Sequence, residues 1–221
     1  MRNPRSTRFL VIAAVLVSMT AIASSCGIPL DDQPRLAASE NSNDLSGQDS
    51  QTAGSQPVWV YFVKNGQLLS VRRPAEAKAP ADVTNLLISG VIQTERNLGL
   101  ESLIPSTVQL RGVNIESNTV TVNLSGTFDD VVGTIRAQAI GQLTMSLTEL
   151  NDIESLAIQV EGRPALITSP TSGDVETVSA CDFLPLLPTV ETLAGIGLVG
   201  DDANHLVTRR TTLTSRCPPQ N

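Results

Sequence analysis

Alternating apolar and polar positions predict two β-hairpins in this chain of 221 residues. Residues 58–63 are apolar on both alternating faces, which is typical of a strand with covered neighbours. A turn separates them from a second strand at 67–71. The second hairpin joins residues 108–115, with a bulge expected at Arg111-Gly112, to the half-buried strand 120–124.

Each hairpin is followed by a stretch with helical spacing. After Pro80 the apolar face would consist of Val83, Leu86, Leu87, Gly90 and Val91, although Gly90 could instead close the helix. A second helix is expected from about 134 to 150, with one face made of Ile135, Ala139, Leu143, Leu147 and Leu150. A strand at 156–160 and a short return at 165–167 complete the order ββα, ββα, ββ. This order predicts an α+β domain with two helices packed on one face of a mainly antiparallel sheet.

The first 25 residues are typical of a lipoprotein signal peptide. Three arginines precede an apolar stretch at 9–23, which is shorter than the roughly 20 residues that a membrane-spanning helix needs. Small residues then lead directly to Cys26, as in a bacterial lipobox, where the cysteine receives a diacylglyceryl group and becomes the new N-terminus. The alternative is an ordinary secretory signal cut near Ala23 or Ser25, with Cys26 left as a thiol.

The remainder divides into three parts by composition. Residues 26–56 comprise the lipidated cysteine and a polar, Gly/Ser/Gln-rich linker without hydrophobic periodicity. The folded domain is expected at 57–168, and a C-terminal extension at 169–221. Lipidation of Cys26 would place the chain on the extracytoplasmic face of the cell membrane, with the membrane itself as one partner.

The charge and the aromatic content exclude two classes of partner. Residues 26–221 contain 12 basic and 22 acidic side chains, which argues against a nucleic-acid partner. Phe, Trp and Tyr make up 3% of the chain, too little for a surface that stacks bases or sugars.

Candidate chemistry is sparse. His205 is the one histidine, so a Ser-His-acid or Cys-His arrangement would have to use it, but its flanks lack a nucleophile elbow and we expect it on the surface or in a tail. Residues 195–200 match GxGxxG, yet Asp201-Asp202 follow at once without a βαβ unit, which favours a flexible glycine loop. The acidic pairs lack calcium-loop spacing and are interpreted as solvated turns and caps. We therefore predict no catalytic residue, no cofactor and no metal ligand.

Two cysteines remain once Cys26 is assigned to lipid. Cys181 and Cys217 would form a disulfide in an oxidising compartment, with two free thiols as the alternative. Apolar segments at 183–188 and 193–199 lie between them, so the extension is expected to dock on the domain. Whether it covers the sheet or offers an apolar docking surface stays open.

Several ordered segments resemble the GerMN domain, a family named from a spore-germination protein. The resemblance covers about residues 57–168 and is carried by 58–63, 86–90, 99–105, 120–126, 147–156 and 160–164. The chain departs from the family at Val91, where Pro is frequent, and in having one copy where some members have two. The resemblance implies a link to sporulation and germination, a likeness to ring-building folds of envelope assemblies, and, in actinobacteria, related lipoproteins that accompany a two-component sensor.

The favoured hypothesis is a membrane-anchored extracytoplasmic lipoprotein that is not an enzyme and serves as a protein-interaction or envelope-assembly module, with an envelope protein as its partner. One alternative is a lipoprotein that binds peptidoglycan or a small polar solute, and another is an accessory regulator of a two-component sensor. A deep pocket with converging charges would favour solute binding, whereas an exposed apolar or edge surface would favour the interaction module.

Overall fold

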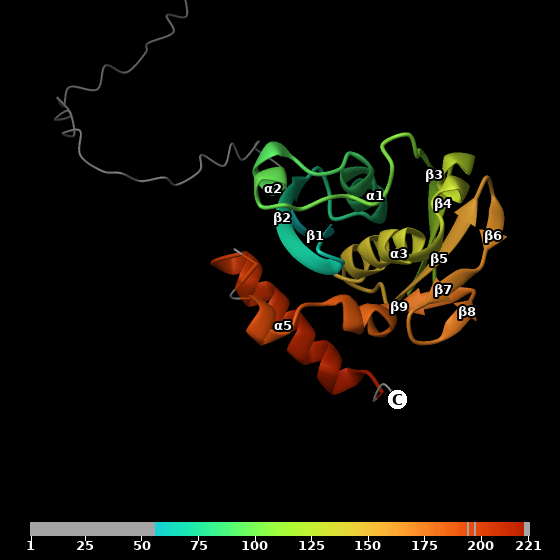
Figure 1. The fold of residues 1–221 in the computed structure, drawn as a ribbon. Helices are drawn as coiled ribbons and strands as arrows, with labels where there is room; N and C mark the ends of the chain where they lie inside the picture. The colour runs from blue at the N-terminus through green and yellow to red at the C-terminus, as the bar shows by residue number, and fades with distance from the viewer. Residues whose placement is uncertain (1–55, 194, 197, 219–221) are drawn as a thin grey trace, which may run out of the picture. The chain divides into compact units, whose positions relative to one another are not determined.

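The computed structural model describes residues 56–193, 195–196 and 198–218. The predicted signal peptide, Cys26 and the linker up to residue 55 lie outside the described residues. The described part is α+β, as predicted, with helix α3 between a hairpin and a larger sheet (Figure 1). None of the helices in these ranges is long and apolar enough to cross a bilayer.

The first predicted hairpin consists of β1 (Gln56–Lys64) and β2 (Gln67–Ala75), which form a two-stranded sheet of their own. Asn65 and Gly66 occupy the turn with φ angles of 52° and 77°. Two successive positive φ angles are the type I′ geometry that matches the twist of paired strands. The turn therefore fixes the register of the whole hairpin.

Helix α1 (Pro80–Ile88) starts with its proline in the first turn, where no N–H partner is needed. Gly90 lies beyond its end with a φ of 74°, and its N–H donates to the carbonyl of Leu87 at 3.1 Å. The alternative that Gly90 closes the helix is thus correct. A short helix that the pattern did not predict, α2 (Gln93–Asn97), follows.

The larger sheet contains the second predicted hairpin and the later strands. Its order is β3 (Leu110–Glu116), β4 (Thr119–Leu124), β5 (Ser155–Val160) and β6 (Arg163–Ala165), with β9 (Thr177–Ser179) also paired to β5. The expected bulge is present, because the register of β3 shifts between Leu110 and Gly112. Strands β4 and β5 are parallel, since α3 (Gly133–Leu147) forms the crossover between them.

Helix α3 is buried on all sides from Ala139 to Leu147 because it lies between the hairpin and the larger sheet. The predicted apolar face was wrong at its first position: Ile135 is 54% exposed, since the first turn of α3 extends beyond the core.

Polar side chains of α3 bond to the outer edge of β1. Ser146 Oγ accepts a hydrogen bond from the Tyr61 N–H at 2.8 Å, and Gln142 Nε2 donates to the Tyr61 carbonyl at 3.1 Å. Further along, Val63 and Glu101 exchange two backbone hydrogen bonds of 2.9 and 2.8 Å. This edge of the hairpin is therefore satisfied without another strand.

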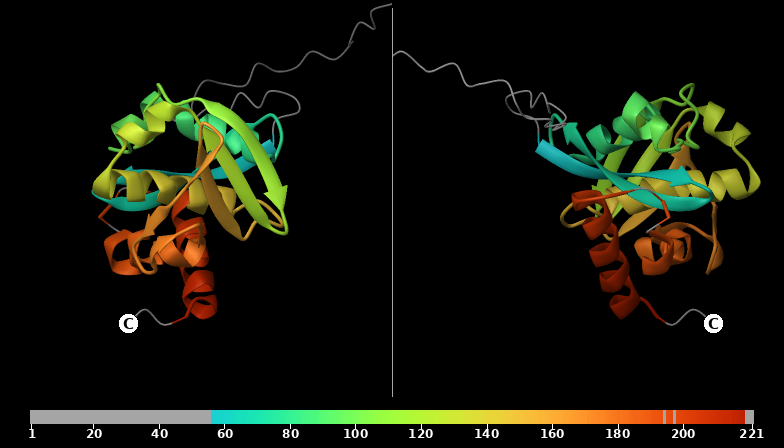
Figure 2. Two further views of the ribbon diagram at one scale, coloured as in Figure 1. Left: turned by 90° about the vertical axis from the view of Figure 1, so that its right-hand side faces the viewer. Right: turned by 60° about the vertical axis from the view of Figure 1, so that its left-hand side comes forward.

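The remaining elements are η1 (Gly126–Asp130), β7 (Ile167–Ser169), β8 (Gly173–Val175), η2 (Ala180–Leu186), α4 (Val190–Leu193) and α5 (Asp201–Arg216). The C-terminal extension docks as expected: β9 joins β5, Phe183 is fully buried, and α5 packs on β2 (Figure 2). A disulfide joins Cys181 to Cys217, with 5.5 Å between their Cα atoms. The extension thus covers the hairpin and is fastened at the end of α5.

Gly141 provides a test of this packing, because hairpin, helix and extension meet there. A Cβ added at Gly141 would lie 2.9 Å from Phe183 Cδ1 and 3.1 Å from Leu68 Cδ1. We expect Gly141→Ala to lower the free energy of unfolding by about 1–3 kcal/mol, which outweighs the roughly 1 kcal/mol gain in helix propensity. Urea denaturation measures the effect.

The matched control is Gly112→Ala, because a Cβ at Gly112 meets nothing within 4 Å. Its effect should stay within about 0.5 kcal/mol. An equal stability of the two variants would contradict the close approach at Gly141.

Candidate functional site

The prediction that His205 lies on the surface or in a tail was wrong. Its side chain is 16% exposed and its ring stacks on Trp59, with 3.9 Å between ring centroids and 13° between ring planes. The reason is that residues 201–216, which the sequence pattern did not identify as a helix, form α5 and pack against the hairpin.

The hairpin register assembles the other side of this cluster. Trp59 stands opposite Arg72, and Tyr61 stands opposite Ser70. Directly opposed residues of antiparallel strands share one face, so these four side chains lie on the same side of the hairpin. The sequence pattern was not used to predict this group, although the two-residue turn and the strand parity together pair these residues.

A hydrogen-bonded chain runs from Ser70 through His205 to Glu149. Ser70 Oγ lies 3.0 Å from His205 Nδ1, and His205 Nε2 lies 3.2 Å from Glu149 Oε2. An ionised carboxylate can only accept, so Nε2 donates to it; in a neutral ring Nδ1 would then accept from the Ser70 hydroxyl. This is the polarity of a Ser-His-acid arrangement.

The burial of Ser70 argues against nucleophilic catalysis by this arrangement. Ser70 is 0% exposed in the middle of β2, so its hydroxyl does not face a surface that a substrate could reach. Nucleophilic serines of such triads instead stand exposed on a sharp turn. The chain of hydrogen bonds therefore acts as a clamp between α5, the hairpin and the end of α3.

Glu149 is the centre of the clamp. Its Oε1 accepts a hydrogen bond of 2.8 Å from the Tyr61 hydroxyl and lies 3.1 Å from Arg209 Nε. The Arg209 N–H is not aligned with that oxygen, so this contact is electrostatic, while Arg209 Nη2 donates to Thr148 Oγ1 at 2.9 Å.

Ionisation within the clamp is shifted in opposite directions at two groups. Burial alone would raise the pKa of Glu149, but the His205 hydrogen bond, the Arg209 charge and the Tyr61 hydrogen bond outweigh it and lower that pKa. Burial, followed by the neighbouring Glu149 charge, raises the pKa of Tyr61 well above its usual value. Both shifts keep the pair in the state in which Tyr61 donates to an ionised Glu149.

A shallow depression of about 350 Å³ opens beside the clamp. Its lining includes Trp59, the two cations Arg72 and Lys78, and Glu149. Arg72 is already 4.0 Å from Asp201, so part of its charge is balanced within the chain.

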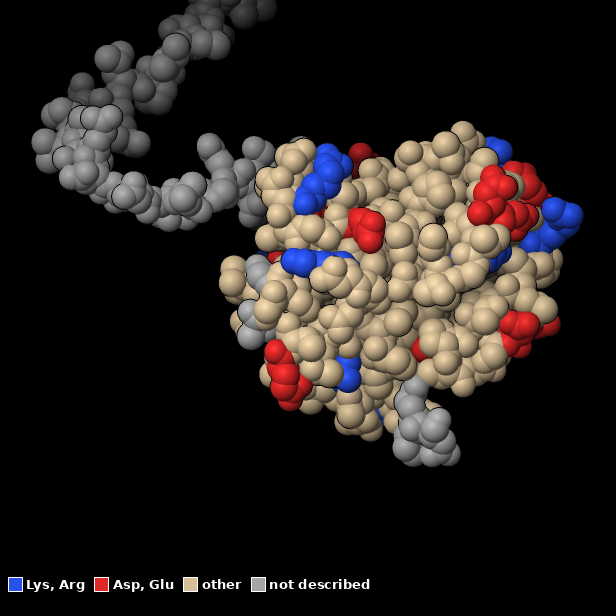
Figure 3. Space-filling model, in the orientation of Figure 1, with Lys and Arg blue, Asp and Glu red and all other residues tan. Residues whose placement is uncertain are grey.

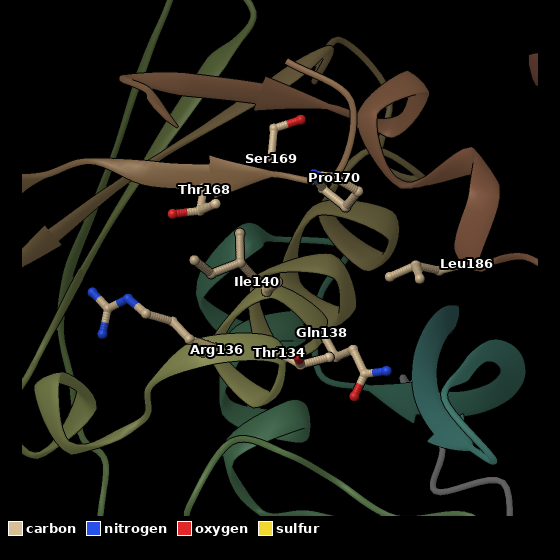
Figure 4. Close-up of a pocket in the computed structure, with 10 residues that line it drawn as sticks. Thr134, Arg136, Gln138, Ile140, Thr168, Ser169, Pro170 and Leu186 are labelled. Atoms are coloured by element: carbon tan, nitrogen blue, oxygen red, sulfur yellow. The ribbon is translucent and has the colours of Figure 1, made fainter. Parts of the chain in front are cut away.

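A second cavity, of about 360 Å³, is a groove between α3, β7 and η2. Figure 4 shows Ile140 pointing from α3 toward β7, with Leu186 on the η2 side. Arg136 lines it too, but its guanidinium donates to the carbonyls of Phe128 and Val131 at 2.8 and 3.2 Å. The groove is therefore mainly apolar. Thr168 and Ser169 also line it, although the Ser169 hydroxyl donates to Asp182 Oδ1 at 2.7 Å.

The charged side chains of the described residues are unevenly distributed over the face shown in Figure 3. In Figure 3 the area over α3 carries few charged side chains, which gather toward the margins of that face. Within the described ranges, no group of three His, Cys, Asp or Glu residues is placed to hold a metal ion.

The acidic pair before His205 has a structural position. Gly200, with a φ of 66°, precedes α5, and Asp201 and Asp202 lie in the first turn of this helix. Carboxylates at a helix N-terminus interact favourably with the helix dipole. The N-cap position is occupied by Gly200, so the pair lies in the first turn of the helix rather than at its cap. Gly197 of the GxGxxG match lies outside the described residues.

Comparison with protein families gave one match. Residues 59–166, just under half of the chain, match the family model Germane, described as sporulation and spore germination. The comparison with curated proteins gave no match.

Three solved structures are similar to this chain. The tandem GerMN domains of the sporulation protein GerM from Bacillus subtilis share 19% identity at a TM-score of 0.44, and the match covers 57% of this chain and 43% of that one. The first GerMN domain of that protein shares 15% identity at a TM-score of 0.46, covering 56% and 97%. A candidate lipoprotein from Clostridium perfringens shares 16% at a TM-score of 0.41, covering 61% and 93%. The chain thus spans less than half of the tandem structure.

Removing the charge of Glu149 tests the clamp. The lowered pKa means that ionised Glu149 stabilises the fold fully above the unfolded pKa of about 4.3, and that this stabilisation is lost as the pH falls through the folded pKa. We expect Glu149→Gln to cost about 3 kcal/mol at pH 7. The difference from the unchanged chain should shrink steadily below pH 4.3.

Chemical denaturation of both chains between pH 7 and pH 3 measures this difference. The control is the exposed Glu154→Gln, which should change stability by less than about 0.5 kcal/mol at every pH. A constant penalty for Glu149→Gln across the pH range would contradict the role of its charge.

Proposed function

The chain contains a GerMN-type domain, and on this premise we propose that it is a membrane-anchored, extracytoplasmic lipoprotein that works as a non-enzymatic interaction module. Its anchor would be Cys26, which follows an apolar leader and a run of small residues. The Cys181–Cys217 disulfide supports a location in an oxidising compartment. The partner we propose is another protein of the cell envelope.

One observation carries the non-enzymatic assignment. The groups with catalytic potential are engaged in internal contacts, because Ser70 is fully buried and Glu149 is paired with Tyr61, His205 and Arg209. The mainly apolar groove beside α3 is open at the same time. Apolar concavities with a few polar groups at the margin are typical binding surfaces.

The linker sets the reach of the module. About thirty residues separate Cys26 from β1, and a flexible chain of that length spans roughly 30 Å on average and about 100 Å when extended. The acidic mature chain would remain soluble beside an anionic membrane surface. The domain could therefore meet a partner held at some distance from the bilayer.

Solute or peptidoglycan binding is the second candidate, and the depression beside the clamp favours it. Trp59 offers an apolar surface there, and Arg72 and Lys78 offer cations for an anionic group. Asp201 lies near Arg72 and offsets part of its positive charge. We therefore expect this depression to bind an anion more weakly than a pocket whose cations are all unpaired. Regulation of a two-component sensor is the third candidate and would require a sensor as the partner.

Replacing the proposed anchor tests the localisation. Cys26→Ala should move the protein from the detergent phase to the aqueous phase or leave it unprocessed, because no thiol remains for the diacylglyceryl group. Phase partitioning and intact-mass measurement report the two outcomes. Ser25→Ala is the control, since it keeps the cysteine and a small preceding residue. Unchanged detergent partitioning of Cys26→Ala would rule out this anchor.

Placing a charged side chain in the groove beside α3 tests whether the proposed envelope protein docks there. Ala137 lines the groove and is partly exposed, so Ala137→Arg should fill it while the domain stays folded. We expect this variant to reduce the recovery of an envelope protein that is cross-linked to the tethered chain at least tenfold. Thr94→Arg, on the exposed side of α2, should retain it.

Mass spectrometry of the cross-linked material decides among the three candidates. Recovery of a sensor kinase would favour the regulatory role, and recovery of wall fragments would favour peptidoglycan binding. Equal recovery of one envelope protein with both arginine variants would contradict the groove as its docking surface.

A further inference from the structure

The outer edge of β3 differs from the outer edge of β1. Strand β3 is the terminal strand of its sheet and pairs only with β4 among the described residues. The corresponding edge of β1 is bonded to Ser146, Gln142 and Glu101. Figure 2, left, shows β3 and β4 at the margin of the sheet. The outward backbone groups of β3 are thus available to another strand.

The edge of β3 has little protection against such pairing. Natural edge strands are usually blocked by lysine, proline, inward charges or bulges. Strand β3 has neither lysine nor proline, and its protective features lie toward its ends: Arg111 and the bulge at one end, and Glu116 at the other. The last three residues, 114–116, are exposed, and Ile115 is 50% exposed.

The two faces of β3 are distinguished by its pairing with β4. Val113 and Ile115 stand opposite the buried Val122 and Val120, so they lie on the core side of the sheet. Asn114 stands opposite Thr121 on the other side. Any strand that pairs with β3 must match this alternation, because opposed residues share a face.

We propose that two copies of this protein pair through their β3 edges, antiparallel, about a two-fold axis at Asn114. In this register Val113 of each copy stands opposite Ile115 of the other, and the two Asn114 residues stand opposite each other. Apolar residues then meet apolar residues, and amide meets amide. The contact is isologous, as most homodimer contacts are.

Neighbouring registers fit less well. A shift of the axis to Val113 places Arg111 opposite Ile115, and an axis midway between two residues places Val113 opposite Asn114, on the wrong face. With the axis at Asn114, each Glu116 stands opposite Gly112, which has no side chain, so the two acidic groups do not face each other. Of the three axis positions compared, the one at Asn114 pairs apolar residues with apolar residues on the core side and keeps the acidic groups apart.

The inference rests on the proposed interaction module and names a second copy as one of its partners. The paired segment is short, from Gly112 to Glu116, so we expect a weak dimer. Anchoring on one membrane would raise the local concentration of copies and favour it.

Cysteine cross-linking of the full chain in membranes tests the axis. In Asn114→Cys, two opposed thiols should be oxidised by copper phenanthroline to one disulfide, with the reagent taking up the two electrons. We expect at least tenfold more covalent dimer than with Thr121→Cys, which lies on the same face but one strand further from the edge. Equal yields, or cross-links of Cys at 114 only to a different protein, would overturn the proposal.

A second pair of variants separates pairing from folding. Ile115→Lys places a charge opposite Val113 of the second copy, whereas Ile135→Lys makes the same change on α3 at a residue of similar exposure, 54% against 50%. Added to Asn114→Cys, the first should reduce the cross-link at least fivefold and the second should leave it unchanged. Equal effects of the two lysines would contradict pairing through β3.

Membrane fractionation of the same samples reports anchoring independently. A membrane-bound Asn114→Cys chain that does not cross-link overturns the dimer and leaves the proposed anchor intact. If the chain is not membrane-bound, sedimentation equilibrium at high concentration replaces cross-linking, and a monomer there overturns the dimer.

Discussion

The burial of α3 on two sides is the constraint on which the rest of the structure depends. A helix enclosed by a hairpin and a sheet cannot leave polar groups unsatisfied, because each unpaired buried group costs about 1–3 kcal/mol. Gln142 and Ser146 meet this requirement by bonding to both backbone groups of Tyr61. The same bonds close the edge of β1 and fix the hairpin against the helix. Gly141 lets the C-terminal extension approach the same helix, since any side chain there would contact Phe183.

The position of the hairpin then determines what the extension can do. One face of the hairpin carries Trp59, Tyr61 and Ser70, and α5 covers it with His205 and Arg209. Glu149 accepts hydrogen bonds from Tyr61 and His205 and forms an ion pair with Arg209, and the disulfide fastens the other end of α5. The arrangement resembles a catalytic triad in its hydrogen bonding but serves stability, because its serine is enclosed.

The surfaces left open are those that the core does not need. The groove beside α3 is apolar because Ile140 and Leu186 reach it from elements whose other faces are buried. The edge of β3 is open because β3 is the terminal strand of its sheet among the described residues. The edge of β1 is instead bonded to side chains of α3. Both the groove and the β3 edge lie outside the contacts that hold the described core together, so a binding partner could occupy either without disturbing the core.

The sequence alone determined the local elements, since these depend on residues close along the chain. The turn at Asn65-Gly66, the bulge before Gly112 and the alternation of β4 all follow from backbone preferences and period-two burial. With Cys26 assigned to lipid, the sequence favoured a disulfide between Cys181 and Cys217 over two free thiols, and the structure contains this disulfide.

Only the tertiary structure decided which face of each element is buried and which residues contact that face. Ile135 continues a helical stripe but extends past the core, which no spacing can reveal. His205 joins residues 135 and 56 positions away, Ser70 and Glu149, because α5 packs on the hairpin. Helix α5 is polar enough to look like a tail, and its stability comes from that packing rather than from its own sequence. Long-range contacts of this kind depend on the whole core, so a local pattern cannot specify them.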